Sequence, residues 1–219
     1  SGNTTGRTLY WVGGQGNWNE TIHWSLASGG VSGECIPTEI DNVIIDNRSM
    51  LSNNFIIYFS LSNISSGHAL CKNFIYDVPN IVGNINIVDM SLYGDITIKQ
   101  NITWSVSRLY LLSHQNTQNI DAPNTTFRSL FFQGKALVKL KSKLTVLFDL
   151  EINSGSFESE SHDINIKNRL ILGNYYPTNT PSIKFNKSKI KIEGPHILYN
   201  PTFIMNPYGI LDGGESYVE

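Results

Sequence analysis

The sequence predicts an all-β protein, a right-handed parallel β-helix in which three short strands form each coil of about 20 residues. In each of a series of apolar pairs, one residue separates the two side chains, so both lie on the same face of a short strand. These pairs recur about every 20 residues, at Leu109/Leu111, Leu130/Phe132, Leu150/Ile152, Leu170/Leu172 and Ile190/Ile192. A strand that returns with a constant period is typical of a solenoid, in which equivalent residues stack in columns.

Two further columns share this period and supply the second and third strands of the coil. One contains Leu144/Val146, Ile164/Ile166, Ile183/Phe185 and Phe203/Met205, and the shorter one contains Val138/Leu140 and Phe157/Ser159. An antiparallel fold such as a sandwich also has many short strands, but it does not require separate columns with one common period. The pattern therefore favours parallel stacking.

Composition sets the broad class of protein. The chain has 219 residues, of which 40% are hydrophobic and 16% charged, and its net charge is -2. No basic stripe typical of a nucleic-acid binder is visible, and no apolar run is long enough to span a membrane. We therefore expect neither nucleic-acid binding nor membrane insertion.

The chain is interpreted as one domain and as a fragment of a longer protein. Residues 1–7 are expected to be a loose N-terminus, and residues 8–219 a single β-helix. Within it we expect an N-terminal cap at 8–42, irregular coils at 43–100 and regular coils at 101–205. The polar stretch Gln115–Pro123 is expected to bulge outward as a loop.

The cap is predicted from three tryptophans that lie among glycines: Trp11, Trp18 and Trp24. The open end of a β-helix would expose core and strand edges, and large aromatic side chains can cover it. In this interpretation the indoles fold inward. In the alternative interpretation they form a platform on which a sugar stacks. A long loop at 26–41 and a strand at 42–46 follow.

Two cysteines, Cys35 and Cys71, match no metal-binding motif. Residue spacing leaves two alternatives open, a disulfide bond or two buried free thiols. A disulfide that closes a loop of this size would contribute about 3–4 kcal/mol.

The N-terminal segments resemble the opening of β-helical repeat regions in large surface proteins of Bacteroidetes, which are adhesin-like or gliding-associated and exported by the type IX pathway. The resemblance is carried by YWVGG at 10–14, GNW at 16–18, HWS at 23–25, CIPT at 35–38, DNVIID at 41–46 and CKN at 71–73. LEINSGSF at 150–157 resembles a common coil of these regions. The chain departs from them at Ile45 and Asn47.

The resemblance implies an extracellular location on the bacterial cell surface, and it favours a disulfide between Cys35 and Cys71. The resemblance does not imply a catalytic site. We expect surface glycans or other cell-surface proteins as partners. The loop at 173–181 is the most distinctive later loop, and its Tyr175 and Tyr176 are candidate ligand-binding residues.

One acidic cluster, formed by Glu158, Glu160 and Asp163, has three interpretations. A shift of 19 residues places Lys139 beside Glu158 and Lys141 beside Glu160, which predicts ion pairs between adjacent coils. The acids could instead hold Ca²⁺, or act as the paired carboxylates of a sugar-cleaving enzyme. We favour the ion pairs, and we predict no catalytic residue, no metal ligand and no cofactor.

The expected function is therefore that of a non-enzymatic extracellular module, adhesive or structural, which binds glycans or surfaces through its loops. The alternative is a polysaccharide lyase or glycoside hydrolase built on a β-helix scaffold. The alternative would require an outer groove lined by converging acids, basic residues and aromatics.

Overall fold

The computed structural model describes residues 5–59, 67–173 and 181–193, together with the backbone of the strands at 203–205, 210–212 and 217–218. Within these residues the chain is all-β, with short strands β1 to β26 and one 3-10 turn, η1 (Thr21–His23). The strands are short because each pair of inward-facing side chains is soon followed by a turn.

The strands form four sheets, which we call A to D. Sheet A contains β1 (Thr8–Trp11), β3 (Trp24–Ser25), β4 (Asn42–Asp46), β7 (Phe74–Asp77), β10 (Ile96–Ile98), β13 (Thr117–Asp121), β16 (Leu137–Leu140), β19 (Ser156–Glu158), β22 (Ser182–Lys184) and β25 (Ile210–Asp212). Sheet B contains β2 (Gly16–Asn17), β5 (Ile56–Tyr58), β8 (Asn84–Asn86) and β11 (Thr103–Trp104). Sheet C contains β6 (Ala69–Cys71), β9 (Asp89–Leu92), β12 (Arg108–Leu111), β15 (Leu130–Phe132), β18 (Asp149–Ile152), β21 (Arg169–Leu172) and β24 (Phe203–Met205). Sheet D contains β14 (Thr126–Phe127), β17 (Leu144–Val146), β20 (Ile164–Ile166), β23 (Lys189–Ile192) and β26 (Tyr217–Val218).

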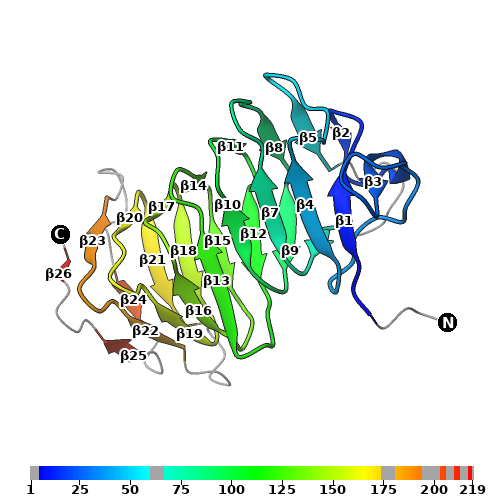
Figure 1. Ribbon diagram of the computed structural model, residues 1–219. Helices are drawn as coiled ribbons and strands as arrows, with labels where there is room; N and C mark the ends of the chain where they lie inside the picture. The colour runs from blue at the N-terminus through cyan, green and yellow to red at the C-terminus, as the bar shows by residue number, and fades with distance from the viewer. Residues whose placement is uncertain are drawn as a thin grey trace.

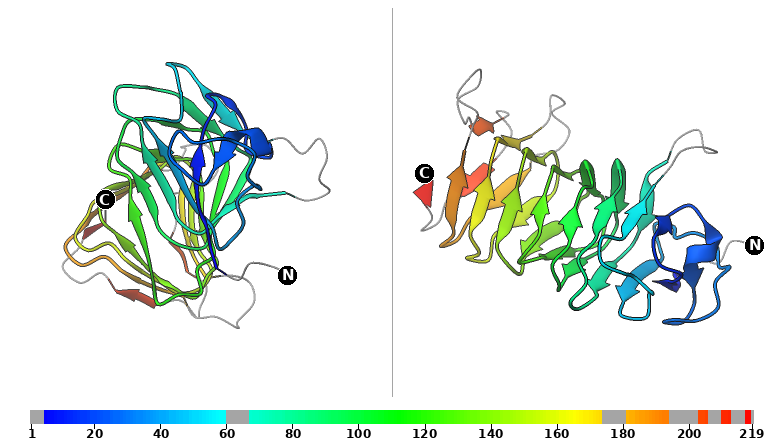
Figure 2. Two further views of the ribbon diagram at one scale, coloured as in Figure 1. Left: turned by 45° about the vertical axis from the view of Figure 1, so that its right-hand side comes forward. Right: turned by 90° about the horizontal axis from the view of Figure 1, so that it is seen from above.

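Parallel pairing links strands that are three positions apart in the chain, so three consecutive strands make one repeat. Strand β4 pairs with β7, β7 with β10, and the same step continues along sheets A and C. Sheet A is mixed, because β3 pairs antiparallel with β1 at its N-terminal edge. The two termini lie at opposite ends of the stack (Figures 1 and 2). The arrangement is compatible with a β-solenoid.

The core consists of the inward side chains of all four sheets, and it is continuous along the stack. In sheet C, Leu109, Leu130, Leu150 and Leu170 are register partners and are at most 1% exposed. The predicted pairing of these residues is confirmed, as is that of Leu144 with Ile164 and that of Val138 with Phe157.

Beyond Leu172 the predicted columns are wrong. Leu170 pairs with Phe203, whereas Ile190 pairs with Ile164 in sheet D. Ile183 joins sheet A beside Phe157. The chain between β21 and β22 lengthens this repeat, so that Ser156 and Ser182, which are partners, lie 26 residues apart. The residue that lies 20 positions after Leu170, Ile190, therefore belongs to a strand of a different sheet.

The N-terminal half has repeats of unequal length, as expected for residues 43–100. The partners Asn42 and Asn73 lie 31 residues apart, and Asn73 and Asp95 lie 22 apart. The expected loop at Gln115–Pro123 is wrong, because it contains strand β13. The inward side chain of Gln118 is buried and donates to the backbone carbonyl of Gly94. A polar residue at an inward position concealed this strand from the apolar pattern.

Candidate functional site

The N-terminal end of the stack is closed by an aromatic cluster. Trp11, Trp18 and Trp24 are at most 1% exposed, and the ring centroids of Trp11 and Trp24 lie 5.1 Å apart at an interplanar angle of 89°. The Nε1–H of Trp24 donates to the carbonyl of Trp18 at 2.9 Å. His23 stacks on Trp11 with centroids 4.5 Å apart. No face of these indoles is open to a sugar, so the platform interpretation is wrong.

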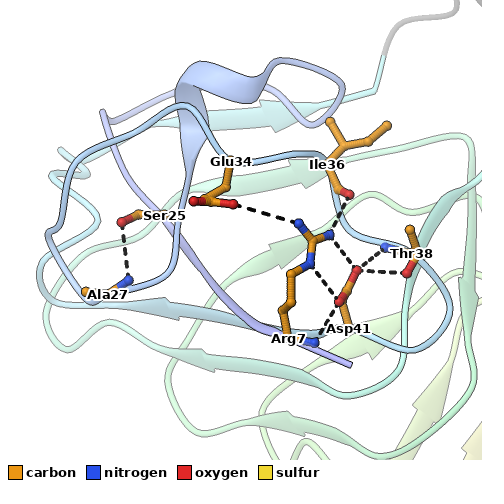
Figure 3. A network of polar contacts seen from close by, with 7 residues as sticks. All are labelled: Arg7, Ser25, Ala27, Glu34, Ile36, Thr38 and Asp41. Carbon is orange, nitrogen blue, oxygen red and sulfur yellow. Dashed lines mark hydrogen bonds and ion pairs between the residues drawn. The ribbon is translucent and has the colours of Figure 1, made fainter. Parts of the chain in front are cut away.

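An ion pair holds the loop at 26–41 against the first strand (Figure 3). Asp41 accepts hydrogen bonds from the backbone N–H and guanidinium of Arg7 and from the backbone N–H and hydroxyl of Thr38. Burial raises the pKa of Asp41, but these hydrogen bonds lower it by more in sum, so the net pKa lies well below the usual range. Arg7, expected in a loose segment, is instead fixed because a buried carboxylate needs a partner.

The predicted disulfide between Cys35 and Cys71 is wrong, because both thiols are free. Cys71 faces the core from β6, beside its register partner Leu92, and is fully buried. Cys35 is exposed on the loop at 26–41. Burial raises the pKa of the Cys71 thiol well above its ordinary value.

The outer face of sheet A carries a ladder of polar side chains that pair with one another. In the N-terminal half, Asn73 donates to Asn42 at 2.7 Å, and the side-chain amide of Asn119 donates to Asp95 at 3.1 Å. Each of these bonds joins register partners of adjacent repeats. The hydrogen-bonding capacity of this half is therefore largely used within the protein.

The C-terminal half of the same face confirms the predicted ion pairs. Lys139 Nζ lies 3.6 Å from Glu158 Oε2 and 3.0 Å from Glu160 Oε1, and Lys141 Nζ lies 2.6 Å from Glu160 Oε2. Lys184 approaches Glu158 from the other side, at 3.8 Å. The hydrogen bonds from Lys141 and Lys139 lower the pKa of Glu160. The general acid of a glycosidase needs the opposite, a raised pKa.

The acids do not converge on a calcium site. Asp163 accepts instead from the backbone N–H of Lys189 at 3.0 Å. In the part of the chain that the structure describes, no group of three or more His, Cys, Asp or Glu side chains is placed to hold a metal ion. The candidate residues Tyr175 and Tyr176 lie outside the described residues.

The outer face of sheet C holds a cluster that sequence reasoning missed. Tyr110 stacks between His68 and Phe131, with centroid distances of 5.3 and 5.2 Å. Beside this ring stack, Asp89 pairs with Arg108 through both carboxylate oxygens. The signal in the sequence was the residue between the two apolar positions of each pair, which is aromatic in two successive repeats.

This cluster is closed rather than open to a ligand. Both faces of the Tyr110 ring are covered by its neighbours, so a sugar ring has no flat surface on which to stack. Nδ1 of His68 lies 2.8 Å from the hydroxyl of Ser91, which is itself buried. Oδ2 of Asp89 lies 3.9 Å from Nε2 of His68, which is beyond hydrogen-bond distance, and both carboxylate oxygens accept hydrogen bonds from Arg108. The Ser–His–Asp combination therefore lacks a carboxylate hydrogen bond that orients the imidazole.

Fold and site together define a class, an all-β protein of stacked parallel sheets in which outward charges such as those of Lys139 and Glu158 are paired between repeats. Comparison of the chain with protein-family models, curated proteins and solved structures finds no match. Among the described residues, no helix has the length and apolar character needed to cross a membrane.

Proposed function

We propose that the protein is a right-handed parallel β-helix with three strands per coil. The in-register step from each strand to the strand three positions later supports this, because every third strand then belongs to the same sheet. Parallel crossover connections within one sheet are right-handed in nearly all proteins, which supports the handedness.

We further propose that this β-helix is a non-enzymatic module of a bacterial cell-surface protein, structural and adhesive, which binds surface glycans or other surface proteins. The observation that carries this proposal is the pairing of outward charges between successive repeats. Lys139, Lys141 and Lys184 compensate Glu158 and Glu160 on sheet A, and Arg169 binds Asp149 on sheet C through two hydrogen bonds. Charges compensated in this way favour stacking of repeats into a rod rather than acid–base chemistry.

The extracellular location rests on the resemblance of the N-terminal segments to surface proteins of type IX-exporting Bacteroidetes. A long rod with paired surface charges suits a stalk that displays the turns between its strands. Because adjacent repeats contribute most of each other's buried surface, such a module gains length without a change of architecture.

The proposal is tested on intact cells of the source organism. An antibody against residues 8–193 should label unpermeabilised cells, and external protease should remove the signal, whereas labelling only after permeabilisation would contradict the surface location. The purified chain is also incubated with polysaccharides, and release of reducing ends or unsaturated products is measured. Cleavage that is lost in a Glu158→Gln/Glu160→Gln variant would instead establish the lyase or hydrolase.

A further inference from the structure

The outer face of sheet B, continued over β14 and β17 of sheet D, differs from the outer faces of sheets A and C. It carries uncharged hydrogen-bonding side chains in successive repeats, at positions linked by register, whereas the later strand β23 of sheet D presents charged side chains such as Lys191. Asn84 pairs with Thr103, and Thr126 pairs with Thr145. We name as the amide–hydroxyl face the residues Asn84, Asn101, Thr103, Asn124, Thr126 and Thr145.

These side chains have unused hydrogen-bonding capacity. Asn101, Thr103, Asn124 and Thr126 are exposed, and within the described ranges their side chains make no hydrogen bond to the protein. On sheet A, by contrast, amides and carboxylates at equivalent outward positions bind one another.

The middle of this face also lacks sheet hydrogen bonds. No ladder joins β11 to β14 in the part of the chain that is described, and sheets B and D are separate for this reason. Beneath the break, Trp104 and Phe127 pack edge to face with centroids 5.6 Å apart, so the core continues while the backbone ladder does not. Backbone N–H and C=O groups at this break therefore add to the available donors and acceptors.

We propose that the amide–hydroxyl face binds a neutral polysaccharide chain. This inference rests on the proposed adhesive function and assigns it a ligand class and a surface. Sugar hydroxyls both donate and accept hydrogen bonds, as the amides and hydroxyls of this face do. The six residues carry no charge, so they offer no ionic attraction to a polyanion.

An aromatic side chain at one end of the face supports the same ligand class. Tyr58 is 42% exposed and is the register partner of the exposed Asn86, which lies two residues after Asn84. An exposed tyrosine provides an apolar surface for the C–H groups of a sugar and a hydroxyl for its polar groups. Two cations lie at the sheet D end of the face: Arg128 is the next outward residue after Thr126, and Lys143 is the outward residue before Thr145. The guanidinium of Arg128 lies over the ring of Phe148.

The test uses the whole chain in affinity gel electrophoresis. The gels contain one of the neutral polysaccharides laminarin, xylan, mannan and dextran, or one of the acidic polysaccharides alginate and heparin. The variant Thr103→Val/Thr126→Val removes two hydroxyls while it keeps side-chain shape and strand propensity. We expect retardation by at least one neutral polysaccharide, and about tenfold weaker binding by the variant, because it loses two hydrogen bonds to the sugar.

The matched control is Thr97→Val, which removes the same hydroxyl from the outer face of sheet A and should bind like the parent chain. Circular dichroism establishes that each variant is folded. Unchanged affinity of the double variant, together with loss of binding in Tyr175→Ala/Tyr176→Ala, would show that the amide–hydroxyl face is not the binding surface. The proposed adhesive function would remain intact. Binding to acidic polysaccharides alone, or to none of the six, would overturn the inference, whereas labelling of intact cells decides the proposed location independently.

Discussion

Asp41 accepts hydrogen bonds from the backbone N–H, Nε and Nη2 of Arg7 at 2.8, 3.1 and 2.8 Å. The side chain of Asp41 is 2% exposed, so the pair joins the start of β1 to the end of the loop at 26–41 with little competition from water. We predict that Asp41→Ala lowers the free energy of unfolding by about 3 kcal/mol, because it leaves the guanidinium without its buried partner. Urea unfolding measures this.

Glu34→Ala is the control for that substitution. Glu34 lies 3.9 Å from Arg7 and is more exposed, so its removal should change stability by less than about 0.5 kcal/mol. Equal effects of the two substitutions would contradict the structural role of Asp41.

A second prediction concerns acid. The pKa of Asp41 is lowered in the folded chain, as is that of Glu160, so folding favours their charged forms. Their contribution to stability is present above the pKa of an unfolded carboxyl, about 4, and is lost as the pH falls toward the folded pKa. We therefore expect the melting temperature to fall between pH 5 and about pH 2. Asp41→Asn should show a shallower fall of the melting temperature. A fall as steep as that of the parent chain would show that Asp41 is not its cause.

A third prediction concerns close packing in the cap. A Cβ on Gly16 would lie 1.9 Å from Nε2 of His23, whose ring is held against Trp11. Gly16→Ala should therefore destabilise the protein by about 1–3 kcal/mol and change the tryptophan fluorescence. In a His23→Ala background the same substitution should cost little, and an undiminished cost there would show that the clash is not responsible.

A fourth prediction compares two leucines three residues apart. Leu150 is fully buried between Leu130 and Leu170, whereas Leu147 is 41% exposed. Leu150→Ala should lower the free energy of unfolding by about 2–5 kcal/mol, and Leu147→Ala should change it by less than about 0.5 kcal/mol. Chemical denaturation of both variants measures the difference, and similar values would contradict the assigned column.

A fifth prediction tests the state of the cysteines. A thiol reagent should modify Cys35 rapidly in the native protein, because Cys35 is exposed. Cys71 should react only after unfolding, since it is buried and its thiol pKa is raised. Peptide mapping after alkylation identifies the modified residue. A cross-linked peptide that contains both cysteines would contradict the assignment of both as free thiols.

Several structural features were predictable because they depend on local rules. The alternation of apolar residues located strands such as β15, β18 and β21, and their constant spacing predicted the partners of Leu130 and Leu150. The same register, extended to the outward positions, predicted the pairing of Lys139 with Glu158. The burial of Trp11, Trp18 and Trp24 followed from their size and their place beside the first strands.

Other features depend on how many residues each turn takes up, which periodicity cannot reveal. The longer repeat after Leu172 moved Ile190 into sheet D and Phe203 into sheet C. The inward Gln118 was hidden because its partners are backbone carbonyls distant in the sequence.

By itself, the sequence determined an all-β chain of parallel strands in stacked columns, because side-chain alternation and burial act over a few residues. Only the tertiary structure decided which outward polar side chains meet. It showed that Asn73 binds Asn42 and that both thiols are free. It also showed that, among the residues that the structure describes, the hydroxyls of Thr103 and Thr126 have no protein partner. Such contacts depend on register between repeats, and turns of unequal length set that register.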